Sequence, residues 1–159
     1  MTAIPLCIPN DCSWDETSGV IQRDTSQPCT GLQLVHLALR KLRSIGGPVC
    51  VVSIVGEYKK GKSYILGKVF DQGEVFPLGH TIDAKTIGIW LWVVPKKYRD
   101  AQGREFTVVL LDSEGIFQRV EDVYDDAIFT LSVLLSSVLI YNSSGVPGKC
   151  DFDSIEYPF

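Results

Sequence analysis

Apolar residues fall into four short runs between residues 49 and 141, and each run ends at a glycine, a proline or a polar residue. The runs are rich in β-branched and aromatic residues, a composition typical of strands. They predict strands over Val49–Val55, Ile87–Val94, Phe106–Leu111 and Ser137–Tyr141. The third run is almost continuously apolar, which indicates a strand covered on both faces.

A helix is predicted to begin near Thr30, because Thr30 and Gln33 form a capping-box pattern. Apolar residues then recur at helical spacing until two glycines and Pro48 end the pattern; they are Leu32, Val35, Leu39 and Leu42. Further helices are predicted over residues 64–70 and 127–135. Strands that alternate with helices favour an α/β fold with a mostly parallel sheet.

The start of the chain does not follow this alternation. Residues 1–29 are rich in Pro, Asn, Asp, Ser and Thr, so we interpret them as an extended lead-in segment. Within it, an apolar patch at residues 19–21 could form an edge strand. Polar connections are expected at residues 70–85 and 96–104, the second with the character of a charged hairpin. With 159 residues, the chain is long enough for one domain with a buried core.

Composition narrows the class of protein. Hydrophobic residues make up 45% of the chain and charged residues 21%, which is typical of a globular protein. A net charge of −4 and a pI of about 5.1 argue against a nucleic-acid partner, which favours a basic face. The five cysteines have no metal-ligand spacing and indicate a reducing compartment, the cytosol. The longest apolar stretch, residues 127–141, is short for a membrane span.

The residues between the first predicted strand and the helix after it carry the clearest chemistry. Gly56, Gly61, Lys62 and Ser63 match G-x-x-x-x-G-K-[ST], the pattern of a phosphate-binding loop. The glycines let backbone N–H groups turn toward one anion, and the following helix adds its positive N-terminal end. Lys62 would neutralise the β- and γ-phosphates, and the Ser63 hydroxyl would complete the shell of Mg²⁺.

Two further polar segments are candidates for the same site. Asp112 and Gly115 follow a buried strand at its carboxyl end, where ligands bind in α/β sheets. The carboxylate suits Mg²⁺, and the Gly115 N–H suits a γ-phosphate. A threonine before the second predicted strand could place its hydroxyl on Mg²⁺; we select Thr86, with Thr81 as the reserve. Ile116 follows Gly115, and an aliphatic side chain cannot orient an attacking water.

Three motifs together resemble the guanylate-binding protein and atlastin class of large GTPases, in the dynamin superfamily. They are residues 56–64 (GEYKKGKSY), residues 86–92 (TIGIWLW) and residues 111–115 (LDSEG). Residues 134–143 also resemble the helix-to-strand segment of guanylate-binding proteins. The resemblance covers most of residues 30–145, and its second and third motifs are more specific than the phosphate loop.

The resemblance implies a P-loop NTPase three-layer sandwich that binds GTP or GDP, hydrolyses GTP with Mg²⁺ and forms a homodimer through its GTPase (G) domain. The nucleotide-binding residues that it implies are Gly56, Glu57, Tyr58, Lys59, Lys60, Gly61, Lys62, Ser63, Tyr64, Thr86, Asp112 and Gly115. The implied Mg²⁺ ligands are Ser63, Thr86 and Asp112, and the implied catalytic residues are Lys59, Lys62 and Thr86. A cytoplasmic location is expected, with association at the periphery of endomembranes through regions outside this sequence.

Two departures from the family pattern limit what the resemblance implies. The family carries an arginine in the phosphate loop where this chain has Lys59, and lysine lacks the planar guanidinium that contacts two oxygens at once. The family's guanine-reading arginine–aspartate pair, cap and helical region have no counterpart. We therefore expect residues 30–159 to be the N-terminal part of a truncated G domain. Two alternatives stay open: a weakly active or non-catalytic nucleotide-binding or dimerisation module, and another P-loop enzyme such as an ATPase.

Overall fold

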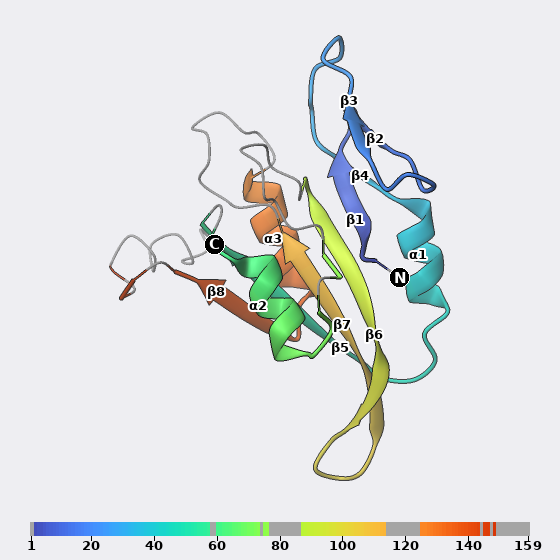
Figure 1. Cartoon of the computed structure of the whole chain (residues 1–159), viewed down its shortest axis with the longest axis vertical. Coiled ribbons are helices and arrows are strands. Elements are labelled where there is room, and N and C mark those ends of the chain that lie inside the picture. Colours follow the sequence, from blue (N-terminus) through green and yellow to red (C-terminus); the bar gives the residue numbers. More distant parts are fainter. Residues whose placement is uncertain are drawn as a thin grey trace.

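A six-stranded sheet forms the centre of the computed structural model, which describes residues 2–57, 60–73, 75–76, 87–113, 125–143, 145–146 and 148. The strands run in the order β4-β1-β6-β7-β5-β8 (Figure 1). They are β1 (Ile4–Pro9), β4 (Leu32–Leu34), β5 (Val49–Gly56), β6 (Ile89–Arg99), β7 (Glu105–Ser113) and β8 (Val138–Asn142). A separate pair of antiparallel strands consists of β2 (Cys12–Trp14) and β3 (Ile21–Arg23).

Helices cover both faces of the sheet, so the molecule has three layers (Figure 1). On one face, α2 (Lys62–Val69) buries Leu66 in an apolar cluster with side chains of β5, β6 and β7. On the other face, α1 (His36–Arg43) and α3 (Asp125–Leu135) bury Ala38 and Ile128 completely. The predicted α/β sandwich is therefore confirmed, as are the four predicted strands and the second and third predicted helices.

The direction of the strands divides the sheet into two halves. β5 pairs in parallel with β7 on one side and with β8 on the other. The pairs β6–β7, β1–β6 and β1–β4 are antiparallel. A short hairpin can join only antiparallel strands, and the predicted charged connection at residues 96–104 is such a hairpin. The expected parallel arrangement thus holds for the half that carries the phosphate-binding sequence, and the whole sheet is mixed.

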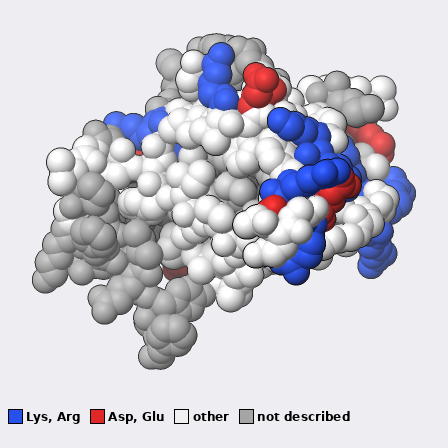
Figure 2. All heavy atoms as spheres, turned by 90° about the horizontal axis from the view of Figure 1, so that it is seen from below, with Lys and Arg blue, Asp and Glu red and all other residues white. Residues whose placement is uncertain are grey.

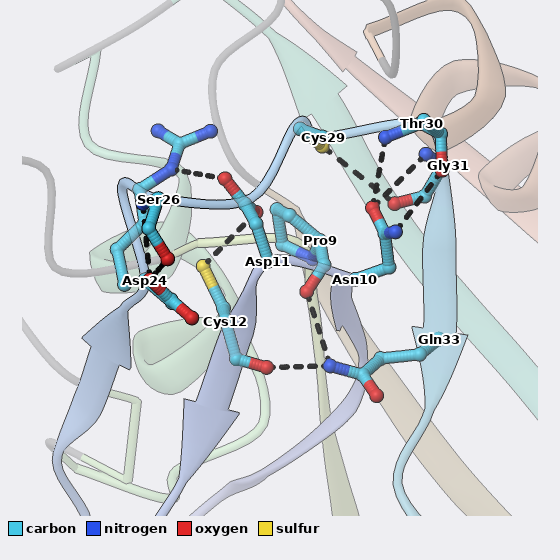
Figure 3. Close-up of polar contacts among 11 residues, drawn as sticks. Pro9, Asn10, Asp11, Cys12, Asp24, Ser26, Cys29, Thr30, Gly31 and Gln33 are labelled. Atoms are coloured by element: carbon cyan, nitrogen blue, oxygen red, sulfur yellow. Dashed lines mark hydrogen bonds and ion pairs between the residues drawn. The ribbon is translucent and has the colours of Figure 1, made fainter.

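The predicted start of the first helix is wrong. α1 begins after Val35, its N-cap, and residues 32–34 form β4 against β1. Thr30 does not cap a helix: its hydroxyl oxygen accepts a hydrogen bond from Asn10 Nδ2 at 3.0 Å, and its backbone N–H donates to Asn10 Oδ1 at 2.9 Å (Figure 3). Gln33 does not reach back to Thr30 either: its amide Nε2 donates to the Pro9 and Cys12 carbonyl oxygens. The open edge of β1 offers these residues ladder hydrogen bonds, and those outweigh the local capping pattern.

Proline does not close the second predicted strand. β6 continues past Pro95 to Arg99, with a register shift between Val93 and Lys97 where it pairs with β7. On its other side, β1 reaches only to Leu91. Pro95 has no N–H to donate, and it is tolerated because neither neighbouring strand has a regular ladder at this point.

The first residues of the chain contribute a strand to the interior of the sheet. All six residues of β1 are buried, and β1 lies between β4 and β6. The sequence predicted only an extended lead-in here, with an edge strand at residues 19–21; β3 begins at Ile21. The turn before β2 holds an ion pair, in which Arg23 Nε lies 2.7 Å from Asp11 Oδ2. Burial opposes ionisation of Asp11, but the Arg23 guanidinium outweighs it and lowers the pKa of this carboxyl.

Cationic side chains gather at the end of the molecule that holds the β6–β7 hairpin, which Figure 2 views from below. The described lysines and arginines of α1 and this hairpin are Arg40, Lys41, Arg43, Lys96, Lys97, Arg99 and Arg104. Two of them pair with acids of the hairpin, Arg99 with Glu105 at 2.8 Å and Arg104 with Asp100 at 2.7 Å. Within the part of the chain that the structure describes, no helix has the length and apolar character needed to cross a membrane.

Candidate functional site

The carboxyl end of β5 leads directly into a glycine loop. Residues 52–56 are buried, because β5 lies between its two parallel neighbours. Gly56 has a φ of +138°, and a Cβ atom added there would lie 2.1 Å from the backbone oxygen of Asn142. Both the positive φ and the close approach of β8 therefore require glycine at the point where the chain leaves the strand.

The loop ends at Gly61, which is the N-cap residue of α2. Gly61 is in the left-handed conformation, with φ 76° and ψ 21°. The Ile65 N–H donates to the Gly61 carbonyl oxygen at 2.9 Å and forms the first hydrogen bond of the helix. No described side chain caps this end of α2. The positive end of the helix therefore faces the loop, as in proteins that bind anions at helix N-termini.

Lys62 is the first residue of α2 and has little contact with solvent. The residue is 6% exposed, and its Nζ donates to the backbone oxygen of Glu57 at 2.7 Å. A buried ammonium group is costly unless polar partners compensate it. Here a loop carbonyl and the nearby negative charge of Asp112 do so. The side chain thus reaches from the start of α2 to the backbone oxygen of Glu57, at the start of the loop that follows β5.

Ser63 and Asp112 join the first turn of α2 to the end of β7. The Ser63 hydroxyl donates to Asp112 Oδ2, with 2.5 Å between the oxygens. Asp112 is fully buried, and burial raises its pKa to about 6, although the Ser63 hydrogen bond and the Lys62 charge act in the opposite direction. Within the described residues, Asp112 Oδ1 is buried and has no hydrogen-bond partner. The carboxylate therefore has one oxygen available for a further ligand.

The donor set at this point fits Mg²⁺. Mg²⁺ prefers hard oxygen ligands, keeps several water molecules and is held by one or two protein groups together with substrate phosphates. The Ser63 hydroxyl and the unpartnered Asp112 oxygen supply such groups. The described residues contain no cluster of three or more His, Cys, Asp or Glu that would hold a metal ion without a substrate.

The structure brings together only part of the predicted site. Gly56, Gly61, Lys62, Ser63 and Asp112 converge at the carboxyl ends of β5 and β7.

Other predicted residues lie at the margin of the loop or cannot be placed. Glu57 and Lys60 form an exposed ion pair at 3.6 Å. Tyr64 is 55% exposed, and the Lys68 Nζ lies 5.5 Å from its ring centroid. The predicted residues Tyr58, Lys59, Thr81, Thr86, Gly115 and Ile116 lie outside the described residues, so their roles stay predictions.

Sequence reasoning missed one residue that contacts the loop. Asn142 ends β8, and its side-chain Nδ2 donates to the backbone oxygen of Lys60 at 2.8 Å. In the register of the sheet, Asn142 also lies opposite Gly56. From the sequence it marked only the end of a strand, because nothing local indicates that β8 lies beside β5.

These features define a protein of the phosphate-binding-loop class: a strand, a glycine loop and a helix surround a lysine, with a serine and an aspartate beside it. A comparison with protein families matches residues 30–157 to the N-terminal domain of guanylate-binding proteins. The chain therefore belongs to the guanylate-binding protein family.

Individual relatives agree with this assignment. Over 122 residues, or 76% of this chain, it is 43% identical to guanylate-binding protein 3 of Homo sapiens and, equally, to guanylate-binding protein 1 of Mus musculus. It is also 43% identical to guanylate-binding protein 2 of Rattus norvegicus over the same length. The matched segment makes up 20% of each of these relatives. The chain therefore spans about a fifth of the length of the curated relatives that it matches.

Proposed function

We propose that this chain binds guanine nucleotides at the loop between β5 and α2, as part of a large GTPase that hydrolyses GTP. One observation carries the proposal: Lys62, Ser63 and Asp112 converge around a glycine loop whose helix presents its N-terminal end. Membership of the guanylate-binding protein family supports guanine as the base. The nucleotide would lie at the carboxyl ends of the parallel strands, where ligands bind in open α/β sheets.

Each of the three side chains has a distinct task in this proposal. Lys62 exchanges the Glu57 carbonyl for phosphate oxygens, a stronger partner because both groups are charged. Ser63 and Asp112 hold Mg²⁺ through the hydroxyl and the unpartnered carboxylate oxygen. When bound, Mg²⁺ neutralises charge on the β- and γ-phosphates. The pKa of Asp112, near 6, leaves this carboxyl mostly ionised at pH 7 even before a cation arrives.

The remaining roles rest on the family resemblance. Thr86 and Gly115 would complete the two switches, and Lys59 would face the transferred phosphate. The same resemblance supports a homodimer through the G domain, a cytoplasmic location and contact with endomembranes through other parts of a longer protein.

Nucleotide titration tests the proposal. A fluorescent GTP analogue is titrated into the chain with Mg²⁺, and unlabelled GTP and ATP compete for the site. We expect Lys62→Ala to weaken binding by about tenfold to a hundredfold, because a charge-assisted contact contributes roughly 1.5–3 kcal/mol. Lys68→Ala removes an exposed lysine from the same helix and should leave the affinity unchanged.

Three outcomes separate the possible functions. Displacement by GTP but not by ATP supports guanine recognition. Displacement by both nucleotides indicates a phosphate site without a base pocket, which is the ATPase-like or weakly specific alternative. Equal affinity of Lys62→Ala and the wild-type chain would contradict a nucleotide site at this loop. Release of inorganic phosphate from GTP then distinguishes a GTPase from a module that only binds.

A further inference from the structure

One residue of β8 contacts both ends of the phosphate-binding loop. At the start of the loop, the Asn142 backbone packs so closely on Gly56 that a Cβ atom would approach its oxygen to 2.1 Å. At the end of the loop, the Asn142 side chain donates from Nδ2 to the Lys60 carbonyl oxygen at 2.8 Å. The same asparagine therefore contacts the loop both where the loop leaves the sheet and where it enters α2.

The second contact fixes the orientation of one peptide group. The Lys60–Gly61 peptide is trans, since the described residues contain no cis peptide bond. In a trans peptide the C=O and the following N–H point in opposite directions. Because Asn142 holds the Lys60 carbonyl oxygen toward β8, the Gly61 N–H points away from β8. Gly61 caps α2, so this N–H belongs to the set of backbone donors at the helix N-terminus.

Among the contacts that the structure describes, this hydrogen bond is the one that holds the Lys60 carbonyl group. Gly61 has no side chain, and a Cβ atom added there would meet nothing within 4 Å. Glycine also has more conformational freedom than any other residue. A binding site whose donors are already oriented does not lose free energy in ordering them when the ligand arrives.

We propose that Asn142 is a positioning residue, which orients the Gly61 N–H toward the phosphate adjoining the N-terminus of α2. The inference rests on the proposed nucleotide-binding function and deepens it. In a phosphate-binding loop the backbone donors next to the helix face the β-phosphate. Asn142 thus favours nucleotides that have a β-phosphate over those that do not.

The test compares GDP, which has a β-phosphate, with GMP, which lacks it. Asn142→Ala removes the donor, and Asn142→Asp replaces it with an acceptor of the same shape. Ser143→Ala and Ser143→Asp are the matched controls, because Ser143 is the next residue and its hydroxyl donates to Gly145 instead of the loop. Ser143→Asp also reproduces the added negative charge. Affinities are measured in the 159-residue chain, with the melting temperature of each variant.

We expect Asn142→Ala to bind GDP about threefold to tenfold more weakly than the wild-type chain, the range for loss of one hydrogen bond. The affinity for GMP should change much less, so the ratio of the GDP to GMP affinities falls. Asn142→Asp should lower this ratio further, and by more than Ser143→Asp does. In ¹⁵N-resolved spectra, the shift of the Gly61 amide on GDP binding should be smaller in Asn142→Ala.

A purely structural role predicts a different result. Then Asn142→Ala would lower the melting temperature and weaken the binding of GDP and of GMP equally. The isosteric Asn142→Asp would change the ratio of the GDP to GMP affinities by no more than Ser143→Asp does. Either result overturns the inference while the proposed function stands. Failure of the wild-type chain to bind GDP at all would overturn both.

Discussion

Asp112 is the residue at which burial and the chemistry of the site oppose each other. Burial favours its neutral form and raises the pKa to about 6, whereas a metal-binding role requires the carboxylate. The ligand-free protein therefore keeps a buried negative charge at neutral pH, and the side chains that compensate it are Ser63 and Lys62. Such a charge lowers the stability of the folded state until a ligand neutralises it.

This opposition predicts a pH dependence of stability in metal-free buffer. In the unfolded chain Asp112 titrates near 3.8, the ordinary pKa of an aspartate, so between about pH 4 and 6 the folded state binds more protons than the unfolded state. The free energy of unfolding should therefore fall as the pH rises through this window. Relative to Asp112→Asn, which cannot titrate, the wild-type chain should lose up to about 3 kcal/mol between pH 4 and 7.

Urea unfolding of the wild-type chain and Asp112→Asn at several pH values, with EDTA present, measures this difference. Asp100→Asn is the control, because Asp100 should change the free energy of unfolding with pH in the opposite direction to Asp112. The Asp100 carboxyl is half-buried, and hydrogen bonds from the Arg104 backbone and side chain lower its pKa, so any contribution it makes is lost as the pH falls. A difference between wild type and Asp112→Asn that stays constant from pH 4 to 7 would contradict a raised pKa at Asp112.

At the scale of elements, α1 begins without a side-chain cap. Val35 is its N-cap, with φ −90° and ψ 117°, and no acidic residue lies in the first turn. These backbone angles suit a serine, whose hydroxyl accepts a hydrogen bond from the N–H of the second or third helical residue. The end of β4, and not a capping residue in the sequence, therefore determines where α1 begins.

We expect Val35→Ser to stabilise the chain by about 0.5–1 kcal/mol, which corresponds to a rise of roughly 1–4 °C in the melting temperature. Val35→Ala removes the same methyl groups without adding the hydroxyl, so it isolates the capping contribution. Thermal unfolding followed by circular dichroism compares the three chains. If Val35→Ser were no more stable than Val35→Ala, the hydroxyl would not cap α1.

The elements that the sequence predicted are those whose signal is local. β5 and β7 are almost continuously apolar, and α2 follows a glycine loop, so composition and motif agree. β1 carries prolines at positions 5 and 9, which argue against a strand, and it becomes one because β4 and β6 lie on either side of it. The residues of β4 were predicted as helix because their local pattern fits a helix. They form a strand only because they pair with β1, which lies more than twenty residues earlier in the chain.

The residues of the candidate site also differ in whether a local sequence signal predicts them. Lys62 and Ser63 belong to a motif of adjacent residues, and Asp112 follows a buried strand, so each has a signature in its own stretch of sequence. Asn142 has none, because its contact with Lys60 exists only after β8 has paired with β5. Local motifs therefore indicate the groups that we propose contact the ligand, and only the tertiary structure reveals the contact between Asn142 and Lys60.

At the scale of the whole molecule, the candidate site and the cationic end lie far apart. Asp112 and Glu105 are near opposite ends of β7, and at about 3.3 Å per residue they are separated by roughly 23 Å. That separation exceeds the Debye length of about 8 Å at physiological ionic strength. If the loop binds phosphate as proposed, the arginines and lysines near the hairpin therefore contribute little to that binding compared with Lys62 and the backbone donors.

The same geometry bears on self-association. The family resemblance implies that two G domains face each other across bound nucleotide, so the contacting surface would be the one that carries the loop between β5 and α2. The net charge of −4 per chain adds only a weak repulsion between two copies, because salt screens it beyond about 8 Å. Under the proposed function, the bound nucleotide supplies the contacts that favour the pair.

We accordingly expect the 17.6 kDa chain to be monomeric without nucleotide and to form a dimer of twice that mass with a non-hydrolysable GTP analogue and Mg²⁺. Sedimentation velocity over a range of protein concentrations measures the change. Lys62→Ala should remain monomeric because it does not retain the analogue, whereas Lys68→Ala should pair as the wild-type chain does. A wild-type chain that is saturated with analogue but still monomeric would contradict dimerisation through this surface and leave nucleotide binding unaffected.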